Sequence, residues 1–449
     1  MRHGALLRGV LLAGATMVAP AGVLRAQGGS TRPASGENAN PMDSIAKLPG
    51  YRGAPDTTQY LAPARIARLV RDGRLRGEWT SYIARSRRQH ALDSLVMAAE
   101  LRSVGATEMR RAPYAHGFEI TAAMTPAWLA SDSGRRLAEV VLSYQAPNGG
   151  WSKHVDFTRG PRQPGESWFG ESTKWQWIST IDNGATTSQM RFLAMADAAR
   201  PDARDRDGFL RGLRYLLAAQ APNGCWPQVW PLEGSYHDAI TFNDDATVNA
   251  ATLLRDVGAG AFSFVPAPMR TAARAATSRV VDCMMKTQVV VDGTPTIWGQ
   301  QHDPLTFAPV SARSYEMASL ASRESAGVVS FLMALPAPDA RVVSAVHHAV
   351  DWFRGHEIFG YAYVPYARRD SAGAGPLWAR MSEIGTNKPI FSNREGIRLY
   401  DYEQLTDRRQ GYAWYSYEPA AVLKEYDSWA AKHPRALADS GRQHPIRDR

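Results

Sequence analysis

Apolar residues in this chain recur mainly at intervals of three and four, the spacing that places them on one face of a helix. From about residue 60 to residue 108 there are two such sets, Leu61, Ile66, Leu69 and Val70, then Ala91, Leu92, Leu95 and Val96. The alternation of apolar and polar residues that is typical of half-buried strands is scarce. The pattern therefore predicts a mainly α fold.

A longer pattern repeats at an interval of about seventy residues. Residues 144–151 are Tyr-Gln-Ala-Pro-Asn-Gly-Gly-Trp, residues 219–226 are Ala-Gln-Ala-Pro-Asn-Gly-Cys-Trp, and residues 287–298 repeat the Gln, Gly and Trp more faintly. Each copy is typical of a helix end, a turn and a closing aromatic residue. Because the interval is long enough for two helices, we expect helical hairpins that close into a ring with their loops at one end.

The tryptophans that follow these turns allow two interpretations. They either pack as structural residues or form platforms for sugar rings around a central depression. The residues concerned are Trp151, Trp226, Trp230 and Trp298.

The two ends of the chain differ from its middle. Residues 1–26 have a basic start, an apolar core and a small residue at Ala26, which predicts a signal peptide and export to the periplasm or the cell exterior. Residues 27–40 form a Gly-, Ser- and Pro-rich tether. We expect a helical subdomain over 41–136, the repeated domain over 137–430 and a polar tail over 431–449. No later apolar run is long enough to span a bilayer.

Charge and cysteine content restrict the function only slightly. The chain has 52 Lys and Arg against 43 Asp and Glu, and loss of residues 1–26, with three arginines and no acid, leaves a formal charge of +6. This excess favours an anionic partner, but the motifs of nucleic-acid-binding proteins are missing from the sequence. Cys225 and Cys283 could pair after export, yet a chain of this size needs no disulfide, so we expect both to pack as small apolar residues.

Two stretches gather side-chain oxygens at a loop-to-helix junction. In Thr180-Ile181-Asp182-Asn183-Gly184 an acid and an amide precede a hydroxyl-rich helix start, and Asn243-Asp244-Asp245 leads into another apolar helix. Such oxygens either cap the helix or hold a hard cation. Nearly one repeat separates the stretches, so they could face each other across the ring.

Arginines in the C-terminal third lie among aromatic and small residues rather than in charge runs. Arg313, Arg380 and Arg394 are the clearest cases. This setting suits a guanidinium that grips a carboxylate with two hydrogen bonds. Internal ion pairs are the alternative, with the candidate partners Glu316, Glu383 and Glu395.

Together these stretches resemble the pectate lyases of the tenth polysaccharide lyase family. The matching segments are 148–151, 180–187, 226–228, 241–246, 312–316, 383–387 and 391–396, within roughly 137–417. The resemblance implies an (α/α)3-barrel and calcium-dependent β-elimination on polygalacturonate (pectate). Two departures are Cys225, where the first repeat has Gly150, and Asn393-Arg394-Glu395 in place of the family's Gly-Arg-Asp.

Transferred to this sequence, the family pattern assigns a role to each candidate residue. It implies that Asp182, Asn183 and Asp244 hold Ca²⁺ with the substrate, while the role of Asp245 stays open. It also implies that Arg394 is the Brønsted base and that Arg313 and Arg380 bind galacturonate carboxylates. We further expect a monomer.

The chemistry accounts for this combination of residues. Anti β-elimination removes the C5 proton beside the uronate carboxylate and expels the C4 oxygen, so cations near that carboxylate stabilise the transition state. Two other functions stay open: an inverting glycoside hydrolase with Asp182 and either Asp244 or Asp245 as acid and base, and an exported uronate-binding protein without turnover.

Overall fold

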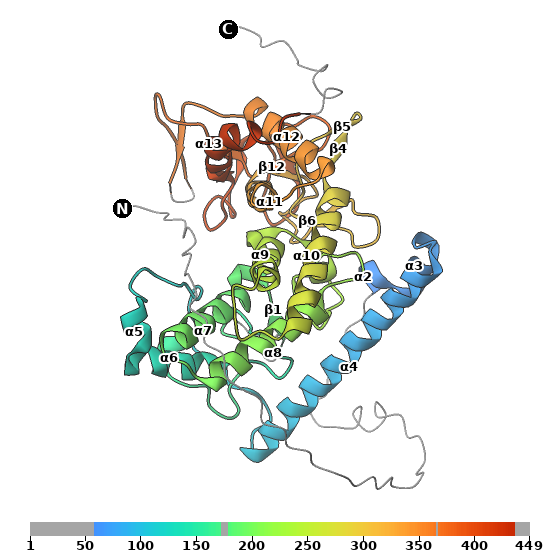
Figure 1. Cartoon of the computed structure of the whole chain (residues 1–449). Helices are drawn as coiled ribbons and strands as arrows, with labels where there is room; N and C mark the ends of the chain where they lie inside the picture. Colours follow the sequence, from blue (N-terminus) through green and yellow to red (C-terminus); the bar gives the residue numbers. More distant parts are fainter. Residues whose placement is uncertain (1–57, 172–177, 365–366, 436–449) are drawn as a thin grey trace. The chain divides into compact units, whose positions relative to one another are not determined.

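The computed structural model describes residues 58–171, 178–364 and 367–435, all within the unit Met42–Arg449 (Figure 1). The predicted signal peptide, the tether and most of the tail lie outside these residues. The helices are α2 (Thr58–Leu61), α3 (Pro63–Leu69), α4 (Gly73–Ser103), α5 (Pro126–Ala130), α6 (Asp132–Ser143), α7 (Thr187–Ala199), α8 (Ala203–Ala219), α9 (Ala246–Ala259), α10 (Ala267–Thr287), α11 (Ser322–Met333), α12 (Ala340–Gly355) and α13 (Glu418–Ala430).

Short antiparallel ladders join the loops between these helices. Each strand has two or three residues, too few to produce a periodic sequence signal, which is why the sequence did not reveal them. The ladders are β1 (Ser179–Thr180) with β2 (Val229–Trp230), β3 (Ile240–Thr241) with β6 (Gln301–His302) and β7 (Pro309–Val310), β4 (Val290–Val291) with β5 (Thr294–Pro295), β8 (Leu320–Ala321) with β12 (Met381–Ser382), β9 (Tyr361–Tyr363) with β10 (Arg368–Asp370), β11 (Trp378–Ala379) with β15 (Tyr415–Ser416), and β13 (Phe391–Ser392) with β14 (Arg398–Leu399).

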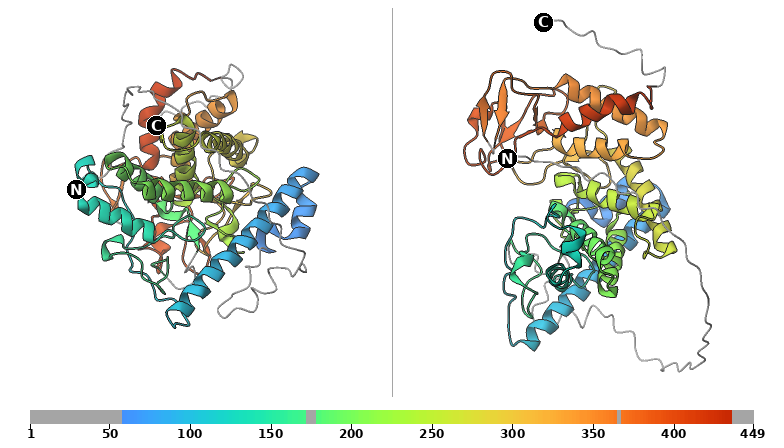
Figure 2. Two further views of the ribbon diagram at one scale, coloured as in Figure 1. Left: turned by 60° about the horizontal axis from the view of Figure 1, so that its bottom comes forward. Right: turned by 60° about the vertical axis from the view of Figure 1, so that its left-hand side comes forward.

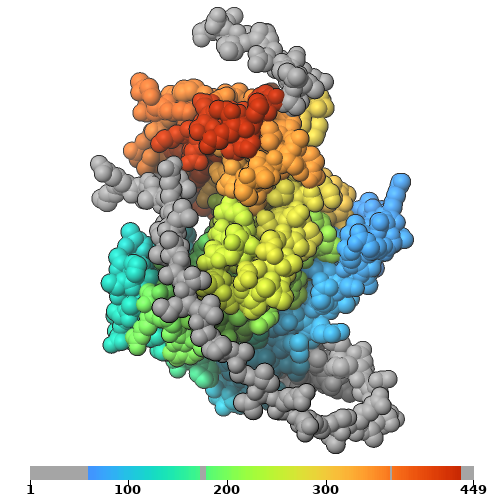
Figure 3. Space-filling view, viewed as in Figure 1, coloured from blue at the N-terminus to red at the C-terminus, as the bar shows by residue number. Residues whose placement is uncertain are grey.

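The helices pack as successive pairs. Helix α7 packs on α8, α9 on α10, and α11 on both α12 and α13. The first helices of these pairs are neighbours in the order α7, α9, α11, and the second in the order α8, α10, α12. Figure 3 shows α9 and α10 side by side in the middle of one face. The mainly α prediction is confirmed, but the described residues form no closed barrel, so the (α/α)3 ring stays a prediction.

The repeated tryptophans stabilise helix ends. After each of α6, α8, α10 and α12, a buried indole N–H donates to a carbonyl oxygen in the last turn of that helix, where carbonyls lack a partner within the helix. The pairs are Trp151 to Val141 (2.8 Å), Trp226 to Leu216 (2.8 Å), Trp298 to Met284 (2.7 Å) and Trp378 to Phe353 (2.8 Å). Since Trp230 is also buried, the sugar-platform interpretation of these residues is wrong.

The repeated glutamines connect one pair of helices to the next. The amide of Gln145 donates to the carbonyl of Gly208 in α8, at 2.8 Å. Gln220 donates in the same way to Ala276 in α10, at 2.9 Å, and Gln288 to Ala345 in α12, at 3.0 Å. The repeat in the sequence therefore records a repeated contact between consecutive pairs.

Cys225 and Cys283 form a disulfide, with their Cα atoms 5.8 Å apart. The expectation that both are unpaired is wrong. Cys225 lies in the second turn and Cys283 in α10, so the bond ties that turn to a neighbouring helix. Cys225, which stands where the first repeat has Gly150, thus cross-links the second repeat.

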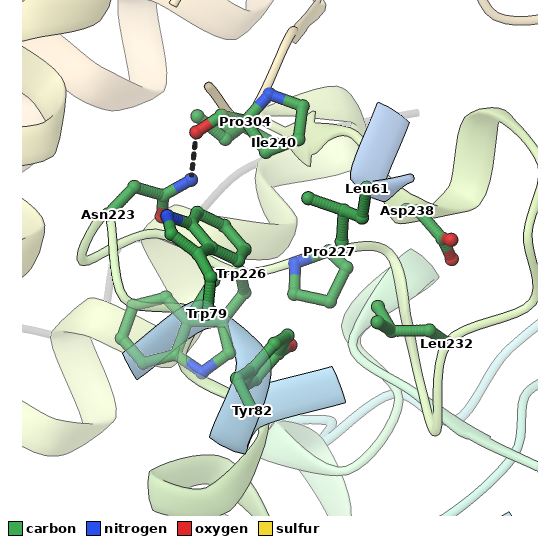
Figure 4. A pocket seen from close by; sticks show the side chains of 11 residues that line it. Leu61, Trp79, Tyr82, Asn223, Trp226, Pro227, Leu232, Asp238, Ile240 and Pro304 are labelled. Atoms are coloured by element: carbon green, nitrogen blue, oxygen red, sulfur yellow. Dashed lines mark hydrogen bonds between the residues drawn. The ribbon is translucent and has the colours of Figure 1, made fainter. Parts of the chain in front are cut away.

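The N-terminal helices pack against the repeats. The left view of Figure 2 shows α4 as one long helix, and the Tyr82 hydroxyl of α4 donates to the carbonyl of Ala219 at 2.8 Å. Figure 4 shows a pocket where Leu61 and Trp79 face Trp226, and where the amide of Asn223 donates to the carbonyl of Pro304 at 3.0 Å. Its lining is mostly apolar, so we assign it to packing. The predicted boundary at 136/137 stays a prediction.

No helix in the described ranges is both long and apolar enough to cross a membrane.

Candidate active site

Two equivalent loops form the centre of the site. One is the 3₁₀ turn Asp182–Gly184 between β1 and α7, and the other is the turn Asn243–Asp245 between β3 and α9. At the same position of each turn a residue other than glycine has a left-handed backbone, with φ of 51° at Asn183 and 49° at Asp244. Such conformations cost energy and are concentrated at functional sites. The loop-to-helix junctions predicted from sequence are confirmed.

Equivalent positions of the two loops contact each other. The amide of Asn243 lies 3.4 Å from Oδ1 of Asp182, its counterpart in the first repeat. The amide of Asn183 lies 3.2 Å from Oδ2 of its own counterpart, Asp244. The amide of Asn243 also donates to Asp244 at 2.9 Å, so one nitrogen joins both carboxylates. An acid meets an amide at each position, which avoids repulsion between two adjacent carboxylates.

Asp182 is the more deeply buried of the two acids. It is 2% exposed, and its carboxylate accepts a hydrogen bond from the ammonium of Lys153. Burial raises the pKa of Asp182, but the charge and hydrogen bond of Lys153, helped by Gln228, outweigh this effect and leave the pKa below its usual value. Asp182 is therefore ionised at neutral and alkaline pH.

Arg380 contacts the second of the two loops. Its guanidinium donates to Glu324 from Nε at 3.0 Å, and to the carbonyl oxygen of the Asn243 side chain at 3.1 Å. It also lies 3.7 Å from Oδ1 of Asp244, as does the guanidinium of Arg323. Arg380 is 4% exposed, and Glu324 was not among its predicted partners. Two cations and two carboxylates thus share this region.

Arg313 is paired within its own loop, as the ion-pair alternative predicts. It donates to Glu316 from Nε at 2.6 Å and from Nη2 at 2.5 Å, which is the bidentate geometry of a guanidinium with a carboxylate. Its charge also contributes to the low pKa of Asp182, so the two residues lie within range of an electrostatic interaction.

Arg394 lies farther out. Its side chain is 67% exposed, and its Nε is 3.6 Å from Asp407. Its carbonyl oxygen accepts a hydrogen bond of 2.7 Å from Ser314, so its loop is joined to the loop of Arg313. All six predicted site residues therefore belong to one connected region, with Arg394 at its edge.

Asp245 packs against α11. A Cβ atom at Gly327 of α11 would lie 2.1 Å from its Oδ1, so the carboxylate fills the space left by that glycine. Burial raises the pKa of Asp245 to about 6. We assign Asp245 to the contact with α11.

Four residues of the site follow from the repeat, and sequence reasoning missed three of them. Lys153, Gln228, Gln300 and Arg380 each lie two positions after one of the tryptophans that close the helix ends. Lys153 and Gln228 act on Asp182, while Gln300 and Arg380 donate to the side-chain oxygen of Asn243. Only Arg380 was predicted, and for another reason. Alignment of the repeats on their tryptophans, and of Asn243 on Asp182, would have revealed the rest.

The donor set suits a hard cation only in part. Asp182, Asp244 and Asn183 offer oxygens, the ligand type that Ca²⁺ prefers. Within 58–171, 178–364 and 367–435, however, three or more His, Cys, Asp or Glu side chains are nowhere grouped so that they could hold a metal. The residues fit Ca²⁺ if further oxygens come from the substrate.

Comparisons with known proteins place the chain in a family. Residues 145–423 match the model of the pectic acid lyase family. The structure resembles a family 10 polysaccharide lyase from Cellvibrio cellulosa, with a TM-score of 0.60 and 32% identity over 71% of this chain and 99% of that chain. An aspartate-to-alanine mutant of that lyase in complex with trigalacturonic acid gives the same TM-score and identity, over 71% and 100%. The search of curated proteins gave no match.

The family model and the structural neighbours identify the chain as a polysaccharide lyase. The chain belongs to the pectic acid lyase family, which confirms the resemblance seen in its sequence.

The ion pair between Lys153 and Asp182 yields a prediction about pH. Replacement Lys153→Met leaves Asp182 buried without its cation, so the pKa of Asp182 rises above its usual value. In the wild type the ionised carboxylate adds stability that is lost as pH falls through the depressed folded pKa, whereas the variant loses stability as pH rises. The variant should therefore be less stable by about 3–5 kcal/mol at pH 8, and the difference should become smaller as pH falls to 4.

Denaturant unfolding in a chelator, at both pH values, measures this difference. The matched control is Lys432→Met, which removes an exposed lysine just after α13 and should have little effect. A loss of stability in Lys153→Met that is the same at pH 4 and pH 8 would contradict the role given to the ion pair.

Proposed function

We propose that this protein is a calcium-dependent pectate lyase that cleaves the α-1,4-galacturonosyl bonds of polygalacturonate by anti β-elimination. The main supporting observation is that Asp182, Asp244, Arg313 and Arg380 meet in one region through their side chains. The neighbouring structure that holds trigalacturonic acid supports an oligogalacturonate substrate. The disulfide supports export, since such bonds persist in oxidising compartments.

Asp182, Asp244 and Asn183 would hold Ca²⁺ in this account. When bound, the ion neutralises the uronate carboxylate and so acidifies the C5 proton beside it. Asp182 is suited to bind Ca²⁺ because its low pKa keeps its carboxylate ionised. Lys153 holds that carboxylate in place and donates to it, so its ammonium must share or release Asp182 as the metal binds.

The arginines have two proposed roles, binding of the substrate carboxylates and removal of the C5 proton. Arg380, fixed by Glu324, and Arg313, fixed by Glu316, have set orientations and direct positive charge toward the site, which suits binding of uronate carboxylates. Arg394 is our proposed Brønsted base. A guanidinium is almost always protonated, so the neutral form is scarce and activity should increase toward alkaline pH.

Arg313 is the alternative base. The charge of Arg313 contributes to the pKa of Asp182, Tyr236 and Tyr315, whereas the charge of Arg394 contributes to that of Tyr315. The pairing of Arg313 with Glu316 opposes this role, because the pair favours the protonated form and raises the pKa of Arg313. We therefore keep Arg394 as the base and test both residues.

A hydrolase fits the site less well. Inverting hydrolysis requires one protonated acid and room for a water between two carboxyl groups about 6.5–9.5 Å apart. The pKa of Asp182 is lowered, and a single amide nitrogen lies 3.4 Å and 2.9 Å from the two carboxylates. The lowered pKa makes Asp182 unsuited to the role of the acid, and the amide of Asn243 lies between the two carboxylates.

Ultraviolet absorbance tests the reaction, because a 4,5-unsaturated product absorbs and a hydrolysis product does not. With polygalacturonate and Ca²⁺ at alkaline pH, the wild type should produce a steady rise in absorbance. A chelator should abolish this rise. Asp244→Asn should reduce the rate by at least about a hundredfold, since it removes half of the carboxylate charge at the metal. New reducing ends without absorbance would identify a hydrolase, and binding without either would identify a binding protein.

Paired variants locate the base. We expect Arg394→Ala to lower kcat by about a thousandfold or more with little change in KM, and Arg313→Ala to act mainly on KM. Initial rates across a range of substrate concentrations and pH values measure both. If instead Arg313→Ala lost kcat and Arg394→Ala changed mainly KM, Arg313 would be the base.

A further inference from the structure

Three arginines surround two tyrosine rings beside the site. The guanidinium carbon of Arg313 is 5.0 Å from the centre of the Tyr315 ring, and that of Arg380 is 4.8 Å from the centre of the Tyr412 ring. The third arginine, Arg408, lies 4.2 Å from the Tyr315 ring and 5.8 Å from the Tyr412 ring. Stacking on aromatic faces holds a guanidinium in a fixed plane and leaves its edge free for hydrogen bonds.

The third arginine differs from the others because it has no anion. Glu316 is engaged by Arg313 and Glu324 by Arg380. The two acids nearest to Arg408 in sequence pair elsewhere, Asp407 with Arg394 and Glu403 with Arg409. In the part of the chain that the structure describes, no carboxylate oxygen lies within 4.0 Å of the Arg408 guanidinium. The one hydrogen bond of its side chain there runs from Nη2 to the carbonyl of Gly411 at 3.2 Å.

One donor of Arg408 is both buried and unused. Its Nε has almost no exposed surface and no hydrogen-bond partner, which is costly for a charged group. The backbone beneath it is fixed, because the buried indole of Trp414 donates to the Arg408 carbonyl at 2.8 Å. A partly buried guanidinium without an anionic partner adds little to the stability of the fold. Because it is held in one orientation, it is suited to bind a carboxylate.

Arg408 is also connected to the centre of the site. The hydroxyl of Tyr412, on whose ring Arg408 and Arg380 both lie, is 3.4 Å from Nε2 of Gln300. Gln300 in turn donates to Asn243, which joins the two metal-site aspartates. Polygalacturonate carries one carboxylate on every sugar, so a chain bound at the aspartates offers further carboxylates to cations nearby.

We propose that Arg408 is a further substrate-binding residue, which receives the carboxylate of a galacturonate adjacent to the one held at Asp182 and Asp244. This inference rests on the proposed function insofar as it takes the substrate to be a polyuronate. It makes Arg408 a determinant of affinity for charged chains rather than a participant in proton transfer.

The test compares Arg408→Gln with Arg409→Gln, the neighbouring arginine that is already paired with Glu403. On polygalacturonate, Arg408→Gln should raise KM by about ten- to a hundredfold with kcat changed less than about threefold, the loss expected for one charge-assisted contact. Arg409→Gln should match the wild type in both. Arg408→Lys keeps the charge but not the planar guanidinium, so its KM should lie between those of the wild type and Arg408→Gln. Equal melting temperatures would show that all variants fold.

A calorimetric titration with trigalacturonate in a chelator measures binding without turnover. Weaker binding by Arg408→Gln than by Arg409→Gln supports the inference even if the wild type forms no unsaturated product, a result that would reject only the proposed function. An active wild type with unchanged KM and binding in Arg408→Gln would overturn the inference. Equal losses in both variants would overturn it too, because they would indicate a general effect of charge.

Discussion

The site depends on contact between two copies of one loop. Asp182 meets Asn243 and Asn183 meets Asp244, so that each pair of equivalent positions joins an acid to an amide. Two aspartates at the same position would repel each other, while two amides would leave no charge to hold a cation. Because the acid and the amide occupy opposite positions in the two loops, both carboxylates can contact the amide nitrogen of Asn243.

The rest of the fold holds these loops in register. Tryptophans close the ends of α6, α8, α10 and α12, and glutamines tie successive pairs of helices together. The residue two positions after each tryptophan then acts at the site, as Lys153, Gln228, Gln300 and Arg380 do. The same repeat therefore supplies both the packing and the polar side chains around the aspartates.

Much of this arrangement was predictable, but for limited reasons. Helical spacing and the turn motif predicted the pairs of helices, and the loop-to-helix junctions at Asp182 and Asp244 were found because polar residues there interrupt an apolar pattern. The partners of the buried charges were not predictable, since Glu324 and Arg380 are far apart in sequence and neither lies in a motif with the other. The disulfide was missed for a similar reason, because length alone made it appear unnecessary.

Most charges in the region are already paired, Asp182 with Lys153, Arg380 with Glu324 and Arg313 with Glu316. Such pairing fixes side chains before substrate arrives, which lowers the cost of binding. It also means that Asp182 and Asp244 alone would hold a cation only weakly. We therefore propose that Ca²⁺ and a uronate carboxylate complete the site together.

Calorimetric titration with Ca²⁺, with and without trigalacturonate, tests this claim most directly in an Arg394→Ala variant that turns over slowly. Our account predicts weak binding of the metal alone and at least a tenfold gain in affinity when trigalacturonate is present. An equal affinity for Ca²⁺ in both titrations would contradict it.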